Sequence, residues 1–142
     1  MNDIFLKWKK KAKESPPRIV LADLGDPRAD EAAQRLMEEE LAQIIPPSID
    51  SNNPYAQMAT DNGLDLSDPL VASALLVKNG EADAAVAGAT RPTADVLKVG
   101  LQILGVSPEV EIVSSCFLMV LPNGNQLAYG DCAVIPAPAS EQ

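Results

Sequence analysis

Short apolar runs alternate along this chain with segments that have the spacing of amphipathic helices. Residues 18–22 (RIVLA) form a compact apolar run, which is typical of a buried strand. Residues 28–43 follow with strong helix formers and with apolar positions three or four residues apart. A turn containing Gly25 and Pro27 separates the two segments, and proline suits the first position of a helix. This order predicts half of a parallel βαβ unit.

The same alternation continues toward the carboxyl terminus. Residues 46–54 are rich in Pro, Ser, Asn and Asp and predict a loop, and residues 55–63 add a poorly defined helical turn. Asp68 and Pro69 open a clear helix that Gly80 ends. The apolar stripe of this helix consists of Leu70, Ala74, Leu75 and Val77. The other predicted elements are an amphipathic helix over 3–14, a strand over 84–88, a helix over 93–104, and strands over 111–121 and 126–134. The helix over 93–104 has Val96, Leu97, Leu101 and Leu104 on one face.

These elements predict a three-layer α/β fold with a mainly parallel sheet, on which the helices 28–43, 69–79 and 93–104 pack. Asn123-Gly124 between two apolar runs predicts a β-hairpin at one edge. The apolar residues 110–135 would leave an edge uncovered in a lone chain. We therefore expect a homodimer through that region.

Composition narrows the functional classes. The chain has 142 residues, 46% hydrophobic and 22% charged, which indicates one globular domain. It contains no histidine, which excludes histidine-based triads and histidine metal sites, and two cysteines are too few for a disulfide framework or a four-cysteine zinc site. No apolar run approaches about 20 residues, and no signal-peptide core follows the amino terminus. We expect a cytoplasmic protein that spans no membrane.

Charge is unevenly distributed. Residues 1–13 hold five lysines and one acid, a net charge of +4, whereas the remaining residues hold 6 basic and 19 acidic groups, a net charge of −13. The basic segment is either a nucleic-acid arm or an amphipathic helix with a solvated basic face. Apolar residues interleave with the lysines, which favours the helix, and the acidic remainder repels nucleic-acid backbones. We expect no nucleic-acid partner.

One loop carries candidate binding chemistry. The segment 88–93 (GATRPT) lies between a predicted strand and a predicted helix, where backbone N–H groups favour an anion. Gly88 permits close approach of a ligand, Thr90 and Thr93 carry hydroxyl donors, and Arg91 offers a bidentate phosphate contact. The alternative is an ordinary helix start after a glycine turn. The segment matches neither a Walker loop nor the dinucleotide-binding glycine pattern.

Other polar positions favour structural roles. In the turn 23–28, the carboxylates of Asp23 and Asp26 favour capping of the next helix over catalysis. Cys116 and Cys132 have no histidine to activate them, so buried inert thiols are favoured over nucleophiles. Four aspartates are possible magnesium ligands, but nothing in the pattern brings them together, and no metal site is predicted; they are Asp23, Asp26, Asp95 and Asp131.

Several segments, kept in one order, resemble the phosphate acetyl/butyryltransferase (phosphotransacetylase) family. The resemblance implies an isocitrate/isopropylmalate-dehydrogenase-like α/β fold and acyl transfer between coenzyme A and inorganic phosphate, which gives acyl phosphate and free coenzyme A. Coenzyme A is then a substrate, and no cofactor is implied. The segments are 18–21 (RIVL), 25–28 (GDPR), 68–70 (DPL), 74–84 (ALLVKNGEADA), 86–89 (VAGA), 93–97 (TADVL), 113–119 (VSSCFLM) and 131–136 (DCAVIP).

The chain also departs from the family pattern. Members are more than twice as long, and the internal region 44–67 looks shortened here. Lys98 stands where the family has a substrate-contacting arginine. A compact ammonium group therefore replaces a planar guanidinium that can donate two parallel hydrogen bonds. Pro92 replaces a usual serine. The family's Ser, Arg and Asp near coenzyme A belong to its carboxyl-terminal half and match no position here, so catalytic residues are unknown.

Two hypotheses follow. The first is a phosphate acyltransferase, or a piece of one, that is incomplete or inactive as this chain alone, because its missing parts either come from a partner chain or were lost. The second is a non-catalytic remnant that binds an anion or acyl phosphate, or that serves to dimerise. In both, the substrate-binding candidates are Gly88, Thr90, Arg91, Thr93 and Lys98. The expected organisation is a basic helix over 1–17, an α/β domain over 18–138 and a tail over 139–142.

Overall fold

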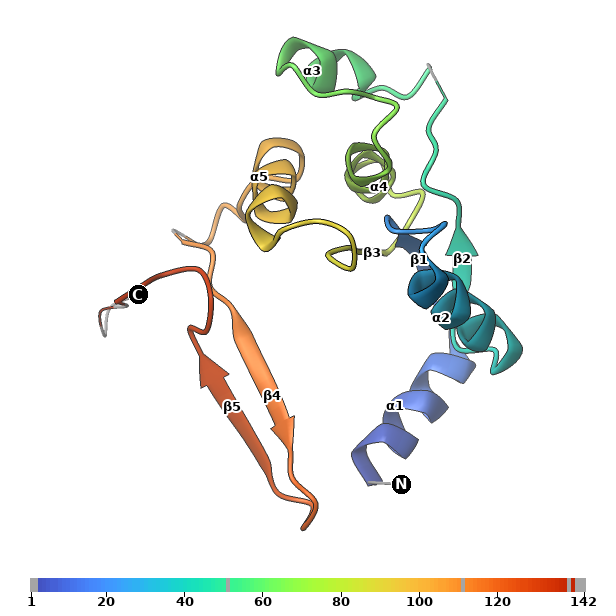
Figure 1. Ribbon diagram of the computed structural model, residues 1–142, viewed down its shortest axis with the longest axis vertical. Helices are drawn as coiled ribbons and strands as arrows, with labels where there is room; N and C mark the ends of the chain where they lie inside the picture. Colours follow the sequence, from blue (N-terminus) through green and yellow to red (C-terminus); the bar gives the residue numbers. More distant parts are fainter. Residues whose placement is uncertain (1–2, 51, 111, 138, 140–142) are drawn as a thin grey trace. The chain divides into compact units, whose positions relative to one another are not determined.

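The computed structural model describes residues 3–50, 52–110, 112–137 and 139 (Figure 1). The chain forms two compact units, Lys9–Gly105 and a second one made of Met1–Trp8 with Val106–Gln142. The domain expected over 18–138 therefore comprises parts of both units. Of the tail expected over 139–142, residues 140–142 lie outside the described residues.

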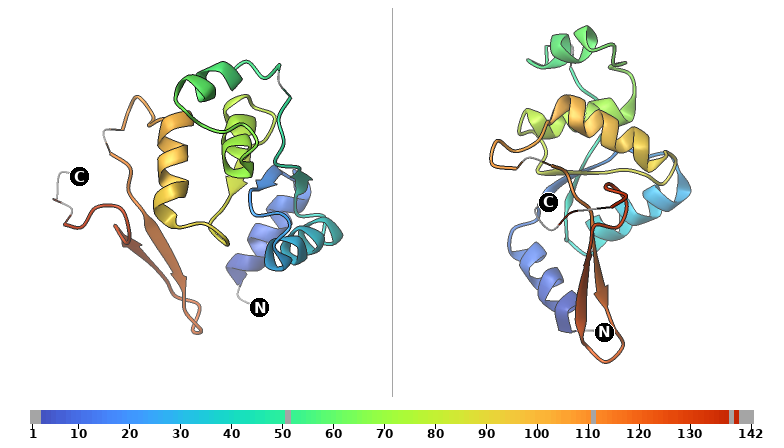
Figure 2. Two further views of the ribbon diagram at one scale, coloured as in Figure 1. Left: turned by 45° about the horizontal axis from the view of Figure 1, so that its top comes forward. Right: turned by 90° about the vertical axis from the view of Figure 1, so that its left-hand side faces the viewer.

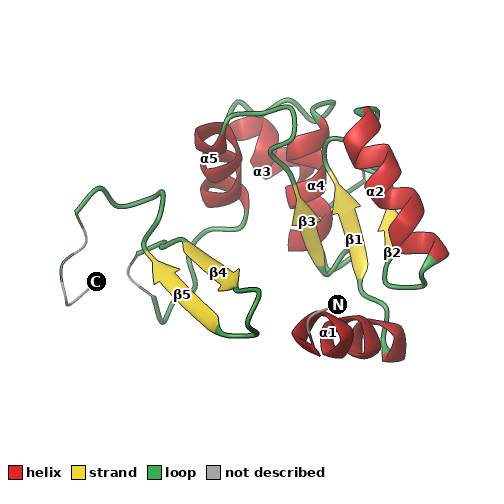
Figure 3. Ribbon diagram, turned by 60° about the horizontal axis from the view of Figure 1, so that its bottom comes forward, coloured by secondary structure: helices red, strands yellow, loops and turns green. Residues whose placement is uncertain are grey.

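A three-stranded parallel sheet forms the centre of the unit Lys9–Gly105. Strand β1 (Arg18–Leu21) lies between β2 (Gln43–Ile45) and β3 (Ala84–Val86), and Val20 is opposite both Ile45 and Ala85 (Figure 3). Val20 and Leu21 are buried, because β1 has a neighbour on each side and helices over its faces. The predicted parallel sheet is confirmed.

Two helices cover this sheet from opposite sides. Helix α2 (Pro27–Glu38) connects β1 to β2, and α4 (Pro69–Lys78) leads into β3. Because β2 and β3 flank β1 on opposite edges and parallel crossovers are right-handed, the two helices must lie on opposite faces. Figures 1 and 2 show this arrangement. The direction of winding reverses between β1 and β3.

Helix α4 is the centre of the core. Every residue from 70 to 76 is buried, so the predicted stripe on one side was incomplete. The reason is that α4 contacts β1 and β3 on one side and α5 (Thr93–Ile103) on another. Leu75 is fully buried, and Ala59 of α3 (Ala56–Asp61) joins the same cluster.

Helix α5 buries only part of the predicted face: Val96 packs against the core, whereas other predicted positions are exposed. Leu101 and Leu104 are 47% and 46% exposed, whereas Val99 and Ile103 are 8% and 1% exposed. The helix carries two apolar stripes, and the one through Val96 packs on the core. The prediction chose between two similar stripes and was wrong for Leu101 and Leu104.

The end of α2 also differs from the prediction. The helix ends at Glu38 rather than at residue 43, because Glu40 adopts a left-handed conformation with φ 55°. The Leu41 N–H then donates to the Leu36 carbonyl at 2.8 Å, which closes the helix end. This turn releases Gln43–Ile45 to form β2, a strand that the sequence did not predict.

In the second unit, β4 (Cys116–Val120) and β5 (Gln126–Gly130) form an antiparallel pair. The Leu121 N–H donates to the Asn125 carbonyl at 2.9 Å, and Gly124 has φ 88°. The strands are shorter than predicted, because residues after Gly130 turn around a carboxylate instead of continuing the ladder; residue 111 lies outside the described residues. None of the described residues of this unit is buried.

Helix α1 (Asp3–Glu14) occupies the predicted amphipathic segment. Phe5 and Trp8 contact each other edge to face, with ring centroids 5.5 Å apart, and Lys9 forms an ion pair with Glu39. Across the described part of the chain, no helix combines the length and the apolar character that crossing a membrane requires.

Candidate functional site

A pocket of about 480 Å³ opens where the carboxyl ends of β1 and β3 meet the amino ends of α2 and α4. In doubly wound sheets, ligands bind at the carboxyl edge where the winding reverses, which is this position. The pocket therefore has the place expected of a ligand site. Its lining consists of Ala22, Asp23, Leu24, Gly25, Asp26, Pro27, Asp68, Pro69, Leu70, Ala87, Thr90 and Arg91.

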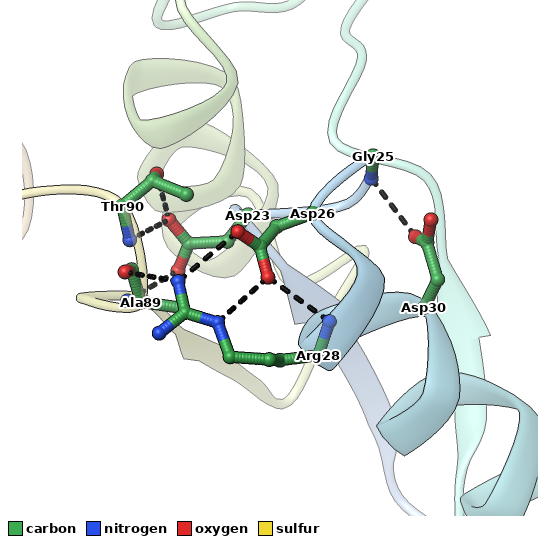
Figure 4. A network of polar contacts seen from close by, with 7 residues as sticks. All are labelled: Asp23, Gly25, Asp26, Arg28, Asp30, Ala89 and Thr90. Atoms are coloured by element: carbon green, nitrogen blue, oxygen red, sulfur yellow. Dashed lines mark hydrogen bonds and ion pairs between the residues drawn. The ribbon is translucent and has the colours of Figure 1, made fainter.

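Asp23 is a buried carboxylate that binds the loop after β3. It is 8% exposed and lies directly beyond β1. It accepts hydrogen bonds from the Ala89 N–H at 3.0 Å, the Thr90 N–H at 3.1 Å and the Thr90 hydroxyl (Figure 4). The Thr90 hydroxyl, followed by these backbone groups, lowers the pKa of Asp23 below its ordinary value. Asp23 is thus an ionised side chain held by donors.

Asp26 and Arg28 make the second connection between the two loops. Asp26 caps α2 by accepting from the Arg28 N–H at 3.0 Å, and its two oxygens also accept from the Arg28 guanidinium. Arg28 in turn donates to the Ala89 carbonyl at 2.7 Å (Figure 4). These contacts, the Arg28 side chain first, lower the pKa of Asp26 to about 2. The predicted cap is confirmed for Asp26, whereas Asp23 binds elsewhere.

Arg91 is the cation that faces the pocket, and it is already paired. Its guanidinium donates to Asp68 at 2.9 Å, and the same Asp68 oxygen caps α4 through the Leu70 N–H at 2.9 Å. The pocket lining therefore holds three carboxylates, Asp23, Asp26 and Asp68, against one arginine. This charge balance opposes an incoming anion.

The structure brings only some of the sequence-predicted residues to this pocket. Thr90 and Arg91 line it, and Gly88, with φ 111°, lies in the same loop. Thr93 begins α5, whose N-cap Pro92 provides no side-chain cap. Lys98 is exposed on α5 and is absent from the pocket lining.

Sequence reasoning predicted the helix start at Asp68, but it missed the binding of Asp23 to the loop, the pairing of Asp68 with Arg91 and the role of Arg28. The only available signal was position. Asp23 follows the first buried strand directly, and the predicted loop follows another parallel strand, so both lie at one edge of the sheet.

A second network surrounds Asp131 in the other unit. Its Oδ1 accepts from the Ser115 hydroxyl and from the N–H groups of Ala133 and Val134 at 3.0 and 3.1 Å, and its Oδ2 accepts from the Ile135 N–H at 2.8 Å. The Ser115 hydroxyl and these backbone donors lower the pKa of Asp131. The carboxylate therefore shapes the turn that follows β5.

The cysteines differ from their predicted environment. Cys116, at the start of β4, is exposed, and Cys132, which follows β5, is half-buried. The Cys132 thiol donates to the Tyr129 carbonyl at 3.0 Å. Within the described ranges, no group of three or more His, Cys, Asp or Glu side chains is placed to hold a metal ion.

Comparison with known proteins identifies the family. A family described as phosphate acetyl/butaryl transferase matches residues 56–142, more than half of the chain. The chain belongs to this family. Among similar proteins, the phosphate acetyltransferase of Corynebacterium glutamicum is 37% identical over 119 residues, which cover 84% of this chain and 32% of the relative. A phosphotransacetylase from Streptococcus pyogenes has the same fold with a TM-score of 0.79 and 25% identity, covering 95% of this chain and 52% of that one.

The chain spans only part of the length of these family members. The phosphate acetyltransferase of Clostridium acetobutylicum is 29% identical over 175 positions, which cover 92% of this chain and 52% of the relative. That alignment is longer than this chain of 142 residues. The relative therefore carries residues within the matched region that have no counterpart here.

Proposed function

We propose that this chain forms one wall of a phosphate acyltransferase site, at which an acyl group passes between coenzyme A and inorganic phosphate. The family match over residues 56–142 is the observation that carries this proposal. The matched range includes the loop after β3 and the whole of α5, where the candidate binding residues lie. The pocket at the carboxyl edge of the sheet supports it, because this is where α/β sheets bind ligands.

In this proposal, phosphate or acyl phosphate binds at the mouth formed by Gly88, Thr90, Arg91 and Thr93, with Lys98 nearby. Arg91 supplies the positive charge, and the loop supplies oriented donors. Lys98 lies more than one turn into α5, so it reaches the anion only if its stem bends back. We expect binding in the millimolar range, equivalent to about −4 kcal/mol.

Isothermal titration with inorganic phosphate tests this site. The wild-type chain should bind weakly, and Arg91→Ala and Thr93→Ala should weaken or abolish binding. Arg35→Ala is the matched control, since it removes an arginine from α2, away from the pocket lining. Unchanged binding in Arg91→Ala and Thr93→Ala, or no binding in any protein, would mean that the loop is only a helix start.

We further propose that this chain alone gives little or no turnover. It spans about half of the relative from Clostridium acetobutylicum, and loss of one preorganised donor typically lowers a rate by about 10²–10³. Thioester formation from acetyl phosphate and coenzyme A measures this, with that relative as the active control. Robust turnover by the purified chain would contradict the claim.

Two further proposals concern the fold of the chain and an alternative function. The chain would have a truncated isocitrate/isopropylmalate-dehydrogenase-like fold, in which the internal region 44–67 is shortened. The alternative function, a non-catalytic or dimerising remnant, is favoured by the exposed apolar side chains of β4 and β5, which include Phe117 at 60% and Tyr129 at 56%. Sedimentation at tens of micromolar distinguishes a homodimer from a monomer, and a clean monomer would remove the dimer proposal.

A further inference from the structure

The loop after β3 already binds an anion, and that anion is part of the chain. Two consecutive N–H groups, at Ala89 and Thr90, and the Thr90 hydroxyl all donate to the Asp23 carboxylate. Successive backbone donors that converge in this way are a common device for binding phosphate and carboxylate groups. The sequence predicted an anion-binding loop at residues 88–93, and Asp23 engages donors of this loop.

Asp23 is well placed to exclude an external anion from these donors. It is 8% exposed, so its carboxylate replaces water around the loop. It also lines the pocket of about 480 Å³ together with Thr90 and Arg91. An anion in this pocket would therefore lie beside a carboxylate whose charge repels it.

The loop does not depend on Asp23 alone for its position. Arg28 donates to the Ala89 carbonyl at 2.7 Å, and the Arg28 side chain is itself held by Asp26. The backbone of Ala89 is thus held at its carbonyl by Arg28 and at its N–H by Asp23 (Figure 4). Removal of the Asp23 charge leaves the arginine contact in place.

We propose that Asp23 is an internal competing anion, which occupies the donors of the loop after β3 and sets the affinity of the pocket for phosphate. This inference rests on the proposed phosphate-binding function of that loop. Withdrawal of Asp23, or its loss, frees two N–H groups and one hydroxyl for a phosphate oxygen. The neighbouring Arg91 then provides the counter-charge.

Phosphate titration of two variants tests the proposal. Asp23→Ala removes both the charge and the acceptor, and Asp23→Asn removes the charge but keeps one acceptor oxygen. We expect the dissociation constant for inorganic phosphate to fall about tenfold in Asp23→Ala and by less in Asp23→Asn, because a like charge close to the ligand is removed.

Asp83→Asn is the matched control. Asp83 is also a hydrogen-bonded carboxylate beside the sheet. It forms an ion pair with Arg18 and accepts from the Arg18 N–H at 2.7 Å at the amino end of β1. Asp83→Asn changes the net charge by the same amount as Asp23→Asn does, but Asp83 is not among the residues that line the pocket. An equal gain of phosphate affinity in Asp83→Asn would show a general charge effect and would overturn the proposal.

Two other outcomes would also overturn it. Phosphate affinity that is unchanged or lower in both Asp23 variants, in protein with wild-type helical circular dichroism, would show that Asp23 only fastens the loop. If Asp23→Ala unfolds, Asp23→Asn decides alone, and loss of folding in both variants would establish a structural role. Phosphate binding by the wild-type chain tests the proposed site, whereas the difference between the wild-type chain and the Asp23 variants tests this inference, so failure of the one is distinguishable from failure of the other.

Discussion

Buried apolar side chains organise the unit Lys9–Gly105, whereas backbone hydrogen bonds and one carboxylate organise the segment around β4 and β5. In the first unit, α4 is buried on all sides, and Leu75 and Val20 are fully buried. In the second, the β4–β5 ladder is regular, but Phe117 is 60% exposed. Turn chemistry and strand pairing can therefore form an element without giving it a core of its own.

The largest expected difference between these regions is in core stability. Leu75→Ala should lower the free energy of unfolding by about 2–5 kcal/mol, because it leaves a cavity at a fully buried position. Leu118→Ala, at a position that is 46% exposed on β4, is the control and should change it by less than about 0.5 kcal/mol. Urea denaturation measures both. Similar effects at the two positions would show that β4 is packed in solution.

Helix α5 allows the same comparison on one element. Ile103→Val removes a single methylene but should lower the free energy of unfolding by about 0.5–1.5 kcal/mol, since Ile103 is 1% exposed. Leu101→Ala removes more atoms from a side chain that is 47% exposed, and it should have the smaller effect. Thermal denaturation measures the loss of stability in the two variants. A larger loss in Leu101→Ala than in Ile103→Val would support the face predicted from the sequence.

The turn after β5 should respond to the loss of one carboxylate without affecting the core. Asp131→Ala removes the acceptor for the N–H groups of Ala133, Val134 and Ile135, and we expect their hydrogen exchange to accelerate. Exchange of the α4 amides should stay unchanged. Ser115→Ala is the partial control. It removes one donor to Asp131 and the hydroxyl oxygen that accepts from the Ala133 N–H, but it leaves the contacts of Val134 and Ile135 with Asp131 in place. Faster exchange throughout the chain would show that the two regions unfold together.

The smallest expected effect is a dependence of stability on acid. The pKa of Asp26 is lowered from 3.8 to about 2 in the folded chain, so protonation favours the unfolded state. Its stabilising contribution is present above pH 4 and is lost as the pH falls toward 2. Asp26→Asn should flatten the decline of the denaturation midpoint over this range. An equally steep decline in Asp26→Asn would assign the acid sensitivity to the other aspartates.

Much of the fold was predictable because its signals are local. The apolar run at 18–22 and the Asp-Pro start at residues 68–69 correspond to β1 and α4. Strand β2 was not predicted because it is only three residues long and directly follows a run of helix formers, and no glycine at position 40 signals the positive φ of Glu40. The buried face of α5 was not predicted correctly because the helix has two apolar stripes of similar hydrophobicity. Only its contact with α4 determines which stripe is buried.

The candidate site was less predictable, because its partners are distant in sequence. The loop 88–93 carries visible donors, but Asp23, which engages the Ala89 and Thr90 donors, lies 66 and 67 residues away from them along the chain. The pairing of Arg91 with Asp68 has the same character, with a separation of 23 residues. Such pairs are determined by the order of strands in the sheet, which hydrophobic periodicity does not reveal.

The left-handed conformation of Glu40 restricts which residues this position can accept during protein engineering. A non-glycine residue in that conformation is disfavoured by about 1–2 kcal/mol, and β-branched side chains fit it worst. Glycine and asparagine are therefore the natural replacements at position 40. A sequence library built on this chain should recover them there, whereas valine or isoleucine would extend α2 into the residues that now form β2 and remove one edge of the sheet.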